Sequence, residues 1–264
     1  MKDGLPCVLD KGGPESVVAF LLEFGSDPNS IRLNTCSALP LAAKYGRLDV
    51  VKLLLDDTRT GIRVKPFNVL VAIMFAVVRD NADVLRYLLD YSVTRCPGLL
   101  QRDKLALIPG LQRSIRMNNP AIVEILLPMI NDLECHMEHN RTPLSLAARY
   151  GNSETLQLLL EKGADPSSNK HGGHVPLVAA WRGRHVQVMG ILLDLGVDPN
   201  ARHNHTGLPL IFHAIRRRHK EIVQLLVTRN LDINITDERG KTALDLAISV
   251  GDNEILDLVK PLYS

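Results

Sequence analysis

The chain has 264 residues, a formal net charge of +2 at pH 7, and a composition that is 45% hydrophobic, 23% charged and 4% aromatic. Such a composition is globular, and the low aromatic content favours helices packed through Leu, Ala and Val over a β-sandwich or barrel. The longest apolar run, residues 67–78, is too short to span a bilayer and predicts a buried helix. The N-terminus has no apolar signal core, so we expect a cytoplasmic or nuclear protein that is not secreted.

A sequence pattern recurs every ~33 residues and predicts the same pair of helices each time. It is clearest from Thr142 to Gly151, Thr-Pro-Leu-Ser-Leu-Ala-Ala-Arg-Tyr-Gly, followed by Leu-Leu-Leu-Glu-Lys-Gly-Ala-Asp-Pro at 158–166. One such pair cannot bury its apolar face alone, so the pairs must stack on one another. We therefore expect one continuous array over residues 1–264, with approximate repeats at 1–30, 31–63, 64–97, 98–135, 136–168, 169–202, 203–235 and 236–264.

The first helix of each repeat has a predicted start. Thr142 is expected to be a helix N-cap, and Pro143 fits the first helical turn. The residue two positions after Thr142 is aliphatic in every repeat, and the residue three positions further on is always small, as close helix packing requires. The equivalents of Thr142 are Ser37, Val71, Pro109, Val175, Pro209 and Thr242.

The end of the first helix is predicted at the position of Gly151, because glycine ends a helix and allows the turn that leads to the second helix. In the repeats that contain Val175 and Pro209, Gly183 and Leu208 also fit the positions that define the start and end of the first helix. The register of these two repeats is therefore open by one residue. The equivalents of Gly151 are Gly13, Gly46, Asp80, Asn118, Arg184, Arg218 and Gly251.

These residues resemble the ankyrin repeat family, whose motif Gly-x-Thr-Pro-Leu-His-x-Ala-Ala-x-x-Gly-His precedes a Leu-rich helix and Gly-Ala-Asp-Pro-Asn. The match covers essentially the whole chain; it is close in the repeats at Thr142 and Thr242 and poor in those at Val71 and Pro109. The resemblance implies an all-α solenoid of about eight helix-turn-helix repeats with short β-hairpin-like connecting loops. It also implies that the chain binds another protein.

In the family, recognition positions are the two residues after the last Ala of the motif and the hairpin residues one, three and four before Thr. The first of these columns is mainly cationic here, and the second adds two tyrosines. Arg and Tyr are typical of interface centres, although cations at a helix C-terminus also complement the helix dipole, and both interpretations stay open. The candidate partner-binding residues are Lys44, Tyr45, Arg116, His139, Arg141, Arg149, Tyr150, His171, His174, Arg182, His205, Arg216 and Arg217.

Histidines concentrate in three successive hairpins, at His136, His139, His171, His174, His203 and His205. Cys135, His136 and His139 have a spacing that suits metal ligands, but no second pair completes a coordination shell. The alternatives are a contact that strengthens as imidazoles gain charge near pH 6.5 and plain solvated loops. We expect no metal and no cofactor.

Three further segments have two interpretations each. The run Arg-Arg-Arg-His-Lys at 216–220 is either a nuclear-import or nucleic-acid patch or a solvated turn. Trp181 stands at a repeat position that is otherwise Ala, Val or Ile. We expect it to be a core residue in preference to a partner-contact residue. The additional residues at 96–109 indicate either drift of the repeat or an insertion that fits a partner.

No Gly-rich phosphate loop, Gly-x-Ser-x-Gly or zincin helix occurs in the sequence, so we do not expect an enzyme. The leading hypothesis is a monomeric adaptor or scaffold that binds an acidic segment of another protein through its concave face. Neither a membrane nor a nucleic acid is an expected partner. The alternatives are a nuclear transcriptional co-regulator, or an ankyrin fragment of a larger regulatory protein or enzyme.

Overall fold

The computed structural model describes residues 5–6, 9, 13, 15–24, 26–29, 36–56, 64–96, 98–99, 104–130, 132–169, 175–203 and 206–263. The chain forms two compact units. Unit 1 comprises Met1–Ser114 with Asn119–Asn131, and unit 2 comprises Ile115–Asn118 with Asp132–Ser264. Among the described residues, no helix is long and apolar enough to cross a membrane.

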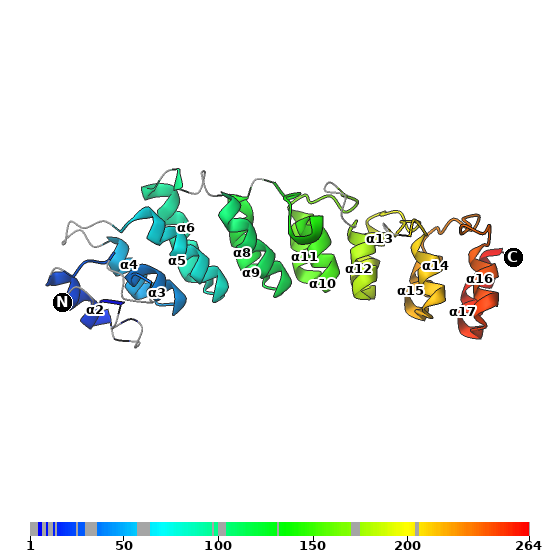
Figure 1. Ribbon diagram of the computed structural model, residues 1–264, viewed down its shortest axis with the longest axis horizontal. Helices are drawn as coiled ribbons and strands as arrows, with labels where there is room; N and C mark the ends of the chain where they lie inside the picture. Colours follow the sequence, from blue (N-terminus) through cyan, green and yellow to red (C-terminus); the bar gives the residue numbers. More distant parts are fainter. Residues whose placement is uncertain are drawn as a thin grey trace. The chain divides into compact units, whose positions relative to one another are not determined.

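Unit 1 consists of paired helices that follow one another in chain order (Figure 1). Its first helices α3 and α5 pack together, and so do its second helices α2 with α4, α4 with α6, and α6 with α9. The helices are α2 (Glu15–Glu23), α3 (Ala38–Lys44), α4 (Leu48–Asp56), α5 (Pro66–Val78), α6 (Ala82–Arg95), α8 (Lys104–Arg116), α9 (Pro120–Leu126) and η1 (Leu127–Met129), with the last two residues of α8 assigned to unit 2.

Unit 2 repeats this arrangement more regularly. First helices pack on first helices, as α10 does on α12, and second helices pack on second helices, as α15 does on α17. The elements are η2 (Glu138–Asn140), α10 (Pro143–Tyr150), α11 (Ser153–Glu161), α12 (Pro176–Gly183), α13 (Val186–Asp194), α14 (Leu210–Arg216), α15 (Lys220–Val227), α16 (Ala243–Val250), α17 (Asn253–Val259) and η3 (Lys260–Tyr263).

The hairpins between the pairs contain isolated antiparallel bridges, Arg202 with Pro209 and Thr236 with Thr242. No strand forms within the part of the chain that the structure describes, so its regular structure is helical. The prediction of an all-α helical repeat fold with hairpin-like connections is confirmed.

The predicted helix starts at Thr142, Thr242, Ser37, Val175 and Pro209 are confirmed, and at Thr142 and Thr242 a side chain also caps the helix. The Thr142 hydroxyl accepts a hydrogen bond from the backbone N–H of Ser145, at 3.2 Å. Thr242 and Asp245 form a reciprocal capping box, in which each side chain accepts a bond from the other's backbone N–H. These bonds satisfy donors that the first helical turn leaves unpaired.

The predicted turn position is confirmed in the seven repeats from Gly46 onwards. Residues with φ between 52° and 76° stand at Gly46, Asp80, Asn118, Gly151, Arg184, Arg218 and Gly251. The left-handed conformation is therefore required by the turn, even where the residue is not glycine. It also settles the open register, because Arg184 takes this conformation while Gly183 remains the last residue of α12.

The predicted helix starts at Val71 and Pro109 are wrong. Both residues lie inside helices of 13 residues, α5 and α8, which begin at Pro66 and Lys104. The additional turn of each helix buries an apolar residue, Val69 in α5 and Leu107 in α8, and for α5 Pro66 occupies the first turn. α6 is also long, at 14 residues, so part of the additional length near residue 96 is helix.

The prediction that the apolar run 67–78 is buried holds for only one side of α5. Val69, Ile73 and Val77 are at most 2% exposed, whereas Phe67, Met74 and Val78 are 70%, 46% and 43% exposed. A helix in a stack contacts its neighbours on part of its circumference, so an apolar run of this length leaves a stripe uncovered.

Candidate partner-binding face

Four arginines mark the ends of successive first helices in unit 2, and we call them the arginine ridge: Arg116, Arg149, Arg182 and Arg216. Each follows a small residue at the predicted close-packing position, and those residues are at most 1% exposed: Ser114, Ala147, Ala180 and Ala214. Because neighbouring helices approach closely there, the last turn of each first helix is held firmly.

A hydrogen bond from the next repeat fixes that last turn. The side chain one position after the left-handed residue reaches back to a carbonyl group near the end of the preceding first helix. His185 Nε2 lies 3.2 Å from the carbonyl oxygen of Arg149. Asn152 Nδ2 donates in the same way to Ile115. The backbone beside Arg116 and Arg149 is therefore tied to the neighbouring repeat.

Arg116 is paired with a carboxylate. It forms an ion pair with Glu138, which belongs to the hairpin that precedes α10. The Tyr150 hydroxyl donates to the other carboxylate oxygen of Glu138 at 3.4 Å, and the Arg116 guanidinium stands 5.8 Å from the centre of the Tyr150 ring. The hydrogen bond from Arg116 lowers the pKa of Glu138, against the effect of burial.

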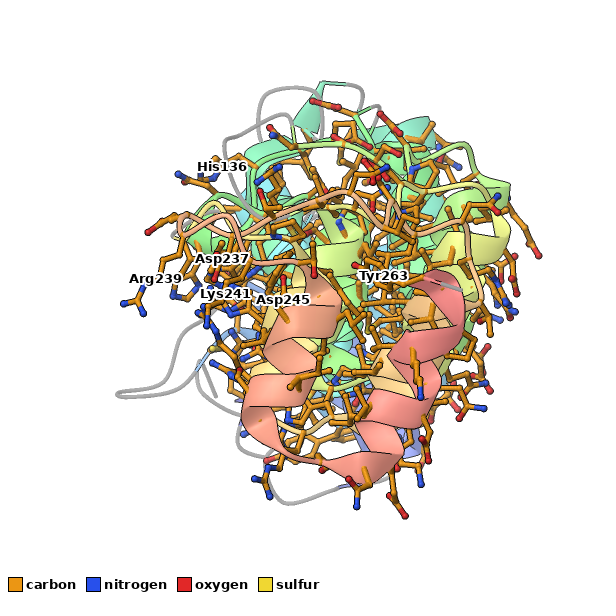
Figure 2. All side chains as sticks on the ribbon, turned by 90° about the vertical axis from the view of Figure 1, so that its right-hand side faces the viewer. His136, Asp237, Arg239, Lys241, Asp245 and Tyr263 are labelled. Carbon is orange, nitrogen blue, oxygen red and sulfur yellow. The ribbon has the colours of Figure 1, made fainter. Side chains whose placement is uncertain are left out.

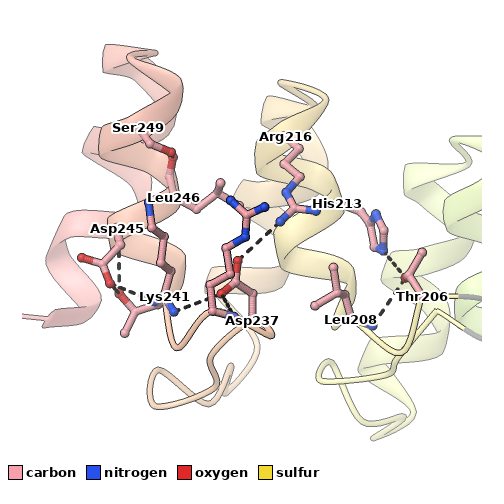
Figure 3. A network of polar contacts seen from close by, with 11 residues as sticks. Thr206, Leu208, His213, Arg216, Asp237, Lys241, Asp245, Leu246 and Ser249 are labelled. Atoms are coloured by element: carbon pink, nitrogen blue, oxygen red, sulfur yellow. Dashed lines mark hydrogen bonds and ion pairs between the residues drawn. The ribbon is translucent and has the colours of Figure 1, made fainter.

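Arg216 is paired in the same manner, with Asp237 in the hairpin before α16 (Figure 3). The two side chains are 3.4 Å apart, and Asp237 is held by backbone N–H groups of Arg239 and Lys241 at 2.9 and 3.0 Å. These backbone bonds are the main reason why the pKa of Asp237 is lowered. Figure 2 shows Asp237 and Lys241 on the α16 side of the last helix pair, away from Tyr263.

Arg141 adds a cation to the middle of the ridge. Burial lowers the pKa of its guanidinium, and repulsion from Arg149 and Arg182 lowers it further, while Glu138 opposes the shift. One terminal nitrogen, Nη1, lies 3.2 Å from Nδ1 of His139, a residue with φ of 56°. The charges of Arg149 and Arg182 therefore act on Arg141, although the three residues lie in separate segments of the sequence.

The model of the family described as ankyrin repeats, in three copies, matches residues 7–97, 111–203 and 177–262. The chain belongs to the ankyrin repeat family. Ankyrin repeats are generally protein–protein interaction modules, and the family is typically non-enzymatic. The ridge lies in the ankyrin repeats of the second and third matched stretches.

Trp181 is 2% exposed, which confirms its prediction as a core residue. The ring centres of His203 and His213 lie 5.4 and 5.2 Å from that of Trp181, and the Arg217 guanidinium lies 5.0 Å from it. Burial lowers the pKa of His213, and the charges of Arg217 and Arg216 lower it further. The Thr206 hydroxyl is 2.7 Å from His213 Nε2 (Figure 3). Arg217 thus covers an aromatic group in this ankyrin repeat.

The remaining predicted residues are distributed over several environments. His171, His174 and His205 lie outside the described residues. In the hairpin before α10, His136 Nε2 is 2.7 Å from Oδ1 of Asn140, while Cys135 is buried. Among the described residues, no three His, Cys, Asp or Glu side chains are grouped so that they could hold a metal ion.

Lys44 and Tyr45 occupy the ridge columns of unit 1. The Lys44 ammonium stands 5.0 Å from the centre of the Tyr45 ring, and Tyr45 is 46% exposed. On the adjacent first helix, the corresponding residue is Val78, which is exposed and apolar. The cationic column therefore belongs mainly to the ankyrin repeats of unit 2.

Unit 1 also has a hollow of about 490 Å³ between its second helices α6 and α9. It is lined by Arg86, Leu89, Asp90, Val93, Glu124, Ile125 and Met129. None of these residues belongs to the predicted binding columns.

Sequence reasoning missed Glu138 and Asp237. A signal for both is present in the sequence, since they follow Arg116 and Arg216 by 22 and 21 residues, roughly the same fraction of a repeat. This spacing leads to an ion pair because each hairpin is stacked against the end of the preceding first helix, which the sequence alone does not show.

Proposed function

We propose that the protein is an adaptor or scaffold, without enzymatic activity, that binds an acidic segment of another protein through the arginine ridge and the adjacent hairpins. The observation that carries the proposal is that Arg116 and Arg216 bind carboxylates within the chain itself. Guanidinium groups in this position are therefore well placed for carboxylate recognition. Charge-assisted bonds from Arg to a carboxylate are among the strongest polar contacts of an interface.

The simpler explanation for the ridge is that its cations complement the helix dipole. In that case the side chains serve their own helices. Arg116 and Arg216 instead reach to carboxylates of the following hairpins, and the first pair is completed by Tyr150. This arrangement supports a surface that binds acidic groups.

The nuclear alternative depended on the basic run at 216–220. Its cations are engaged within the fold: Arg218 donates to the carbonyl of Val250 at 3.2 Å, and Lys220 pairs with Glu254 at 2.7 Å. An import signal has to be available to its receptor, so these contacts favour the adaptor over a nuclear co-regulator.

The test is binding of a fluorescent decaglutamate peptide to wild-type protein and to the triple variant Arg149→Glu, Arg182→Glu, Arg216→Glu. We expect the variant to lose measurable binding and keep its helical circular dichroism. Wild-type binding should also weaken with added salt, since exposed charges are screened beyond ~8 Å at physiological ionic strength.

A matched control changes the same total charge on second helices or after them, through Arg86→Glu, Lys162→Glu and Lys260→Glu. These residues are exposed and lie outside the ridge. If the control triple variant loses binding to the same degree, the ridge is not the binding surface and the proposal is wrong.

A further inference from the structure

One side of α5 carries a row of apolar residues that we call the α5 stripe: Phe67, Val71, Met74 and Val78. Phe67, Met74 and Val78 are exposed, and Val71 is half-buried between them. Residues three or four positions apart lie on the same side of a helix. Since a helix rises about 1.5 Å per residue, the α5 stripe runs for about 16 Å along the helix.

The opposite side of α5 is closely packed. Val69, Ile73 and Val77 are buried, and both α3 and α6 pack against α5. A Cβ atom added to Gly110 of α8 would lie 3.1 Å from Cγ1 of Val77, so α8 also approaches α5 closely. The α5 stripe is therefore the side of this helix that its neighbours in unit 1 leave uncovered.

The exposure of Met74 sets α5 apart from the other first helices that the structure describes. At the corresponding repeat position, those helices have a buried residue (Pro40, Ser145, Val178, Phe212) or a polar one (Gln112, Asp245). An exposed apolar patch on a folded chain typically marks a site where another molecule binds.

The charges around the α5 stripe are cationic. Lys65 precedes α5 and Arg79 follows it, and both side chains are exposed. Arg113 donates to the carbonyl group of the last residue of α5 at 3.3 Å, which places a further cation at that end of the stripe. The acidic residue that follows, Asp80, accepts a hydrogen bond from the side chain of Asn119 at 3.0 Å. No Asp or Glu occurs in the stretches that include α3, α5 and α8, residues 28–48, 58–79 and 104–123.

We propose that the α5 stripe binds an amphipathic α-helix of a partner protein, which packs large apolar side chains against Phe67 and Met74 and carries acidic residues at both of its ends. The acidic ends are complementary to Lys65 at one end of the stripe and to Arg79 and Arg113 at the other. The inference goes beyond the proposed function, since it concerns another surface, in unit 1, and a partner segment with an apolar side.

A helix fits the α5 stripe better than an extended segment does. An extended segment would place unpaired backbone N–H and C=O groups against apolar side chains, whereas a helix satisfies these groups internally. A partner helix with apolar residues at i, i+4, i+7 and i+11 presents an apolar side of the same length as the stripe, about 16 Å.

The experiment measures the fluorescence anisotropy of two labelled peptides of equal composition, each with two glutamates at either end. In the helical-pattern peptide four leucines stand at i, i+4, i+7 and i+11, and in the alternating peptide they stand at i, i+2, i+4 and i+6. We expect the helical-pattern peptide to bind wild-type protein about tenfold more tightly, the gain that burial of one additional large apolar side chain gives.

Two double variants test where the peptide binds. Phe67→Ser with Met74→Ser should abolish the preference for the helical pattern, and the variant should keep its helical circular dichroism because both side chains are exposed. The matched control, Val93→Ser with Leu195→Ser, removes two exposed apolar side chains elsewhere on the chain. This control should keep the preference.

A reversal of charge tests the ends of the stripe. Wild-type protein should prefer the helical-pattern peptide with terminal glutamates over the same peptide with terminal lysines, and Lys65→Glu with Arg79→Glu should reverse that order. Arg86→Glu with Lys162→Glu makes the same change of charge away from the stripe and should leave the order as in wild-type protein.

The outcomes distinguish this inference from the proposed function, which is tested with decaglutamate and the arginine ridge. If neither leucine peptide binds, if the two bind equally, or if the preference survives in the Phe67→Ser, Met74→Ser variant, the inference is overturned and the proposed function stands. An unchanged order of the charged peptides in the Lys65→Glu, Arg79→Glu variant overturns it as well. So does a dimer of wild-type protein that is lost in the Phe67→Ser, Met74→Ser variant, because a second copy of the chain then covers the stripe.

Discussion

Two glycines of one repeat should respond in opposite ways to the same substitution. Gly183 is the last residue of α12, and a Cβ atom there would lie 2.3 Å from His185 Cδ2 and 2.6 Å from the carbonyl oxygen of Arg149. Gly190 lies inside α13, where the nearest atom to an added Cβ, Leu225 Cδ1, is 4.0 Å away. Alanine therefore fits at one position and collides with backbone at the other.

The expected magnitudes follow from these distances. Ala is preferred over Gly in a helix interior by about 0.5–1 kcal/mol, so Gly190→Ala should raise the free energy of unfolding by about that amount. At Gly183 the same preference is opposed by overpacking, which costs about 1–3 kcal/mol. Because the Arg149 carbonyl belongs to a neighbouring helix and cannot rotate away, we expect a net loss of about 1–2 kcal/mol for Gly183→Ala.

Urea unfolding followed by far-UV circular dichroism measures both changes, with the slope of the transition checked for equality among variants. His185→Ala in the Gly183→Ala background should recover only part of the loss, because the contact with the Arg149 carbonyl remains. If Gly183→Ala is as stable as wild-type protein, or if Gly190→Ala is destabilised equally, the close approach of these repeats beside the ridge is incorrect.

Two further predictions concern capping and pH. Thr142→Ala removes the cap bond to Ser145 and should lower the free energy of unfolding by about 1 kcal/mol, which a lower Tm would show. Ser37→Ala should lower it far less, since Ser37 makes no side-chain cap bond. Equal losses in the two variants would contradict the assignment of the caps. The lowered pKa of His213 means that the unfolded chain takes up a proton near pH 6.5 before the folded chain does, so stability should fall as the pH is lowered through this range. Between pH 7.5 and 5.5 the Tm of wild-type protein should therefore drop more than that of His213→Gln, and equal drops would show that His213 is not held in its neutral form.

The sequence was sufficient for the features that every repeat shares. Small residues such as Ala147 and a left-handed residue after each first helix recur because every helix pair meets the same neighbours at the same place. The predicted starts failed at Val71 and Pro109, because an additional helical turn before each of them buries an apolar residue, Val69 in α5 and Leu107 in α8.

The ridge columns were also visible in the sequence, because the position of Arg149 is set by its distance from Ala147 along one helix. The sequence by itself therefore determined the repeat, its turn and the place of the cations. Only the tertiary structure decided which cations are already paired, because Arg116 meets Glu138 and Arg216 meets Asp237 through space, across 22 and 21 residues. Local sequence preferences act within a single helix or turn, whereas these pairs, and the covering of Trp181 by His203 and His213, depend on how one repeat is stacked on the next.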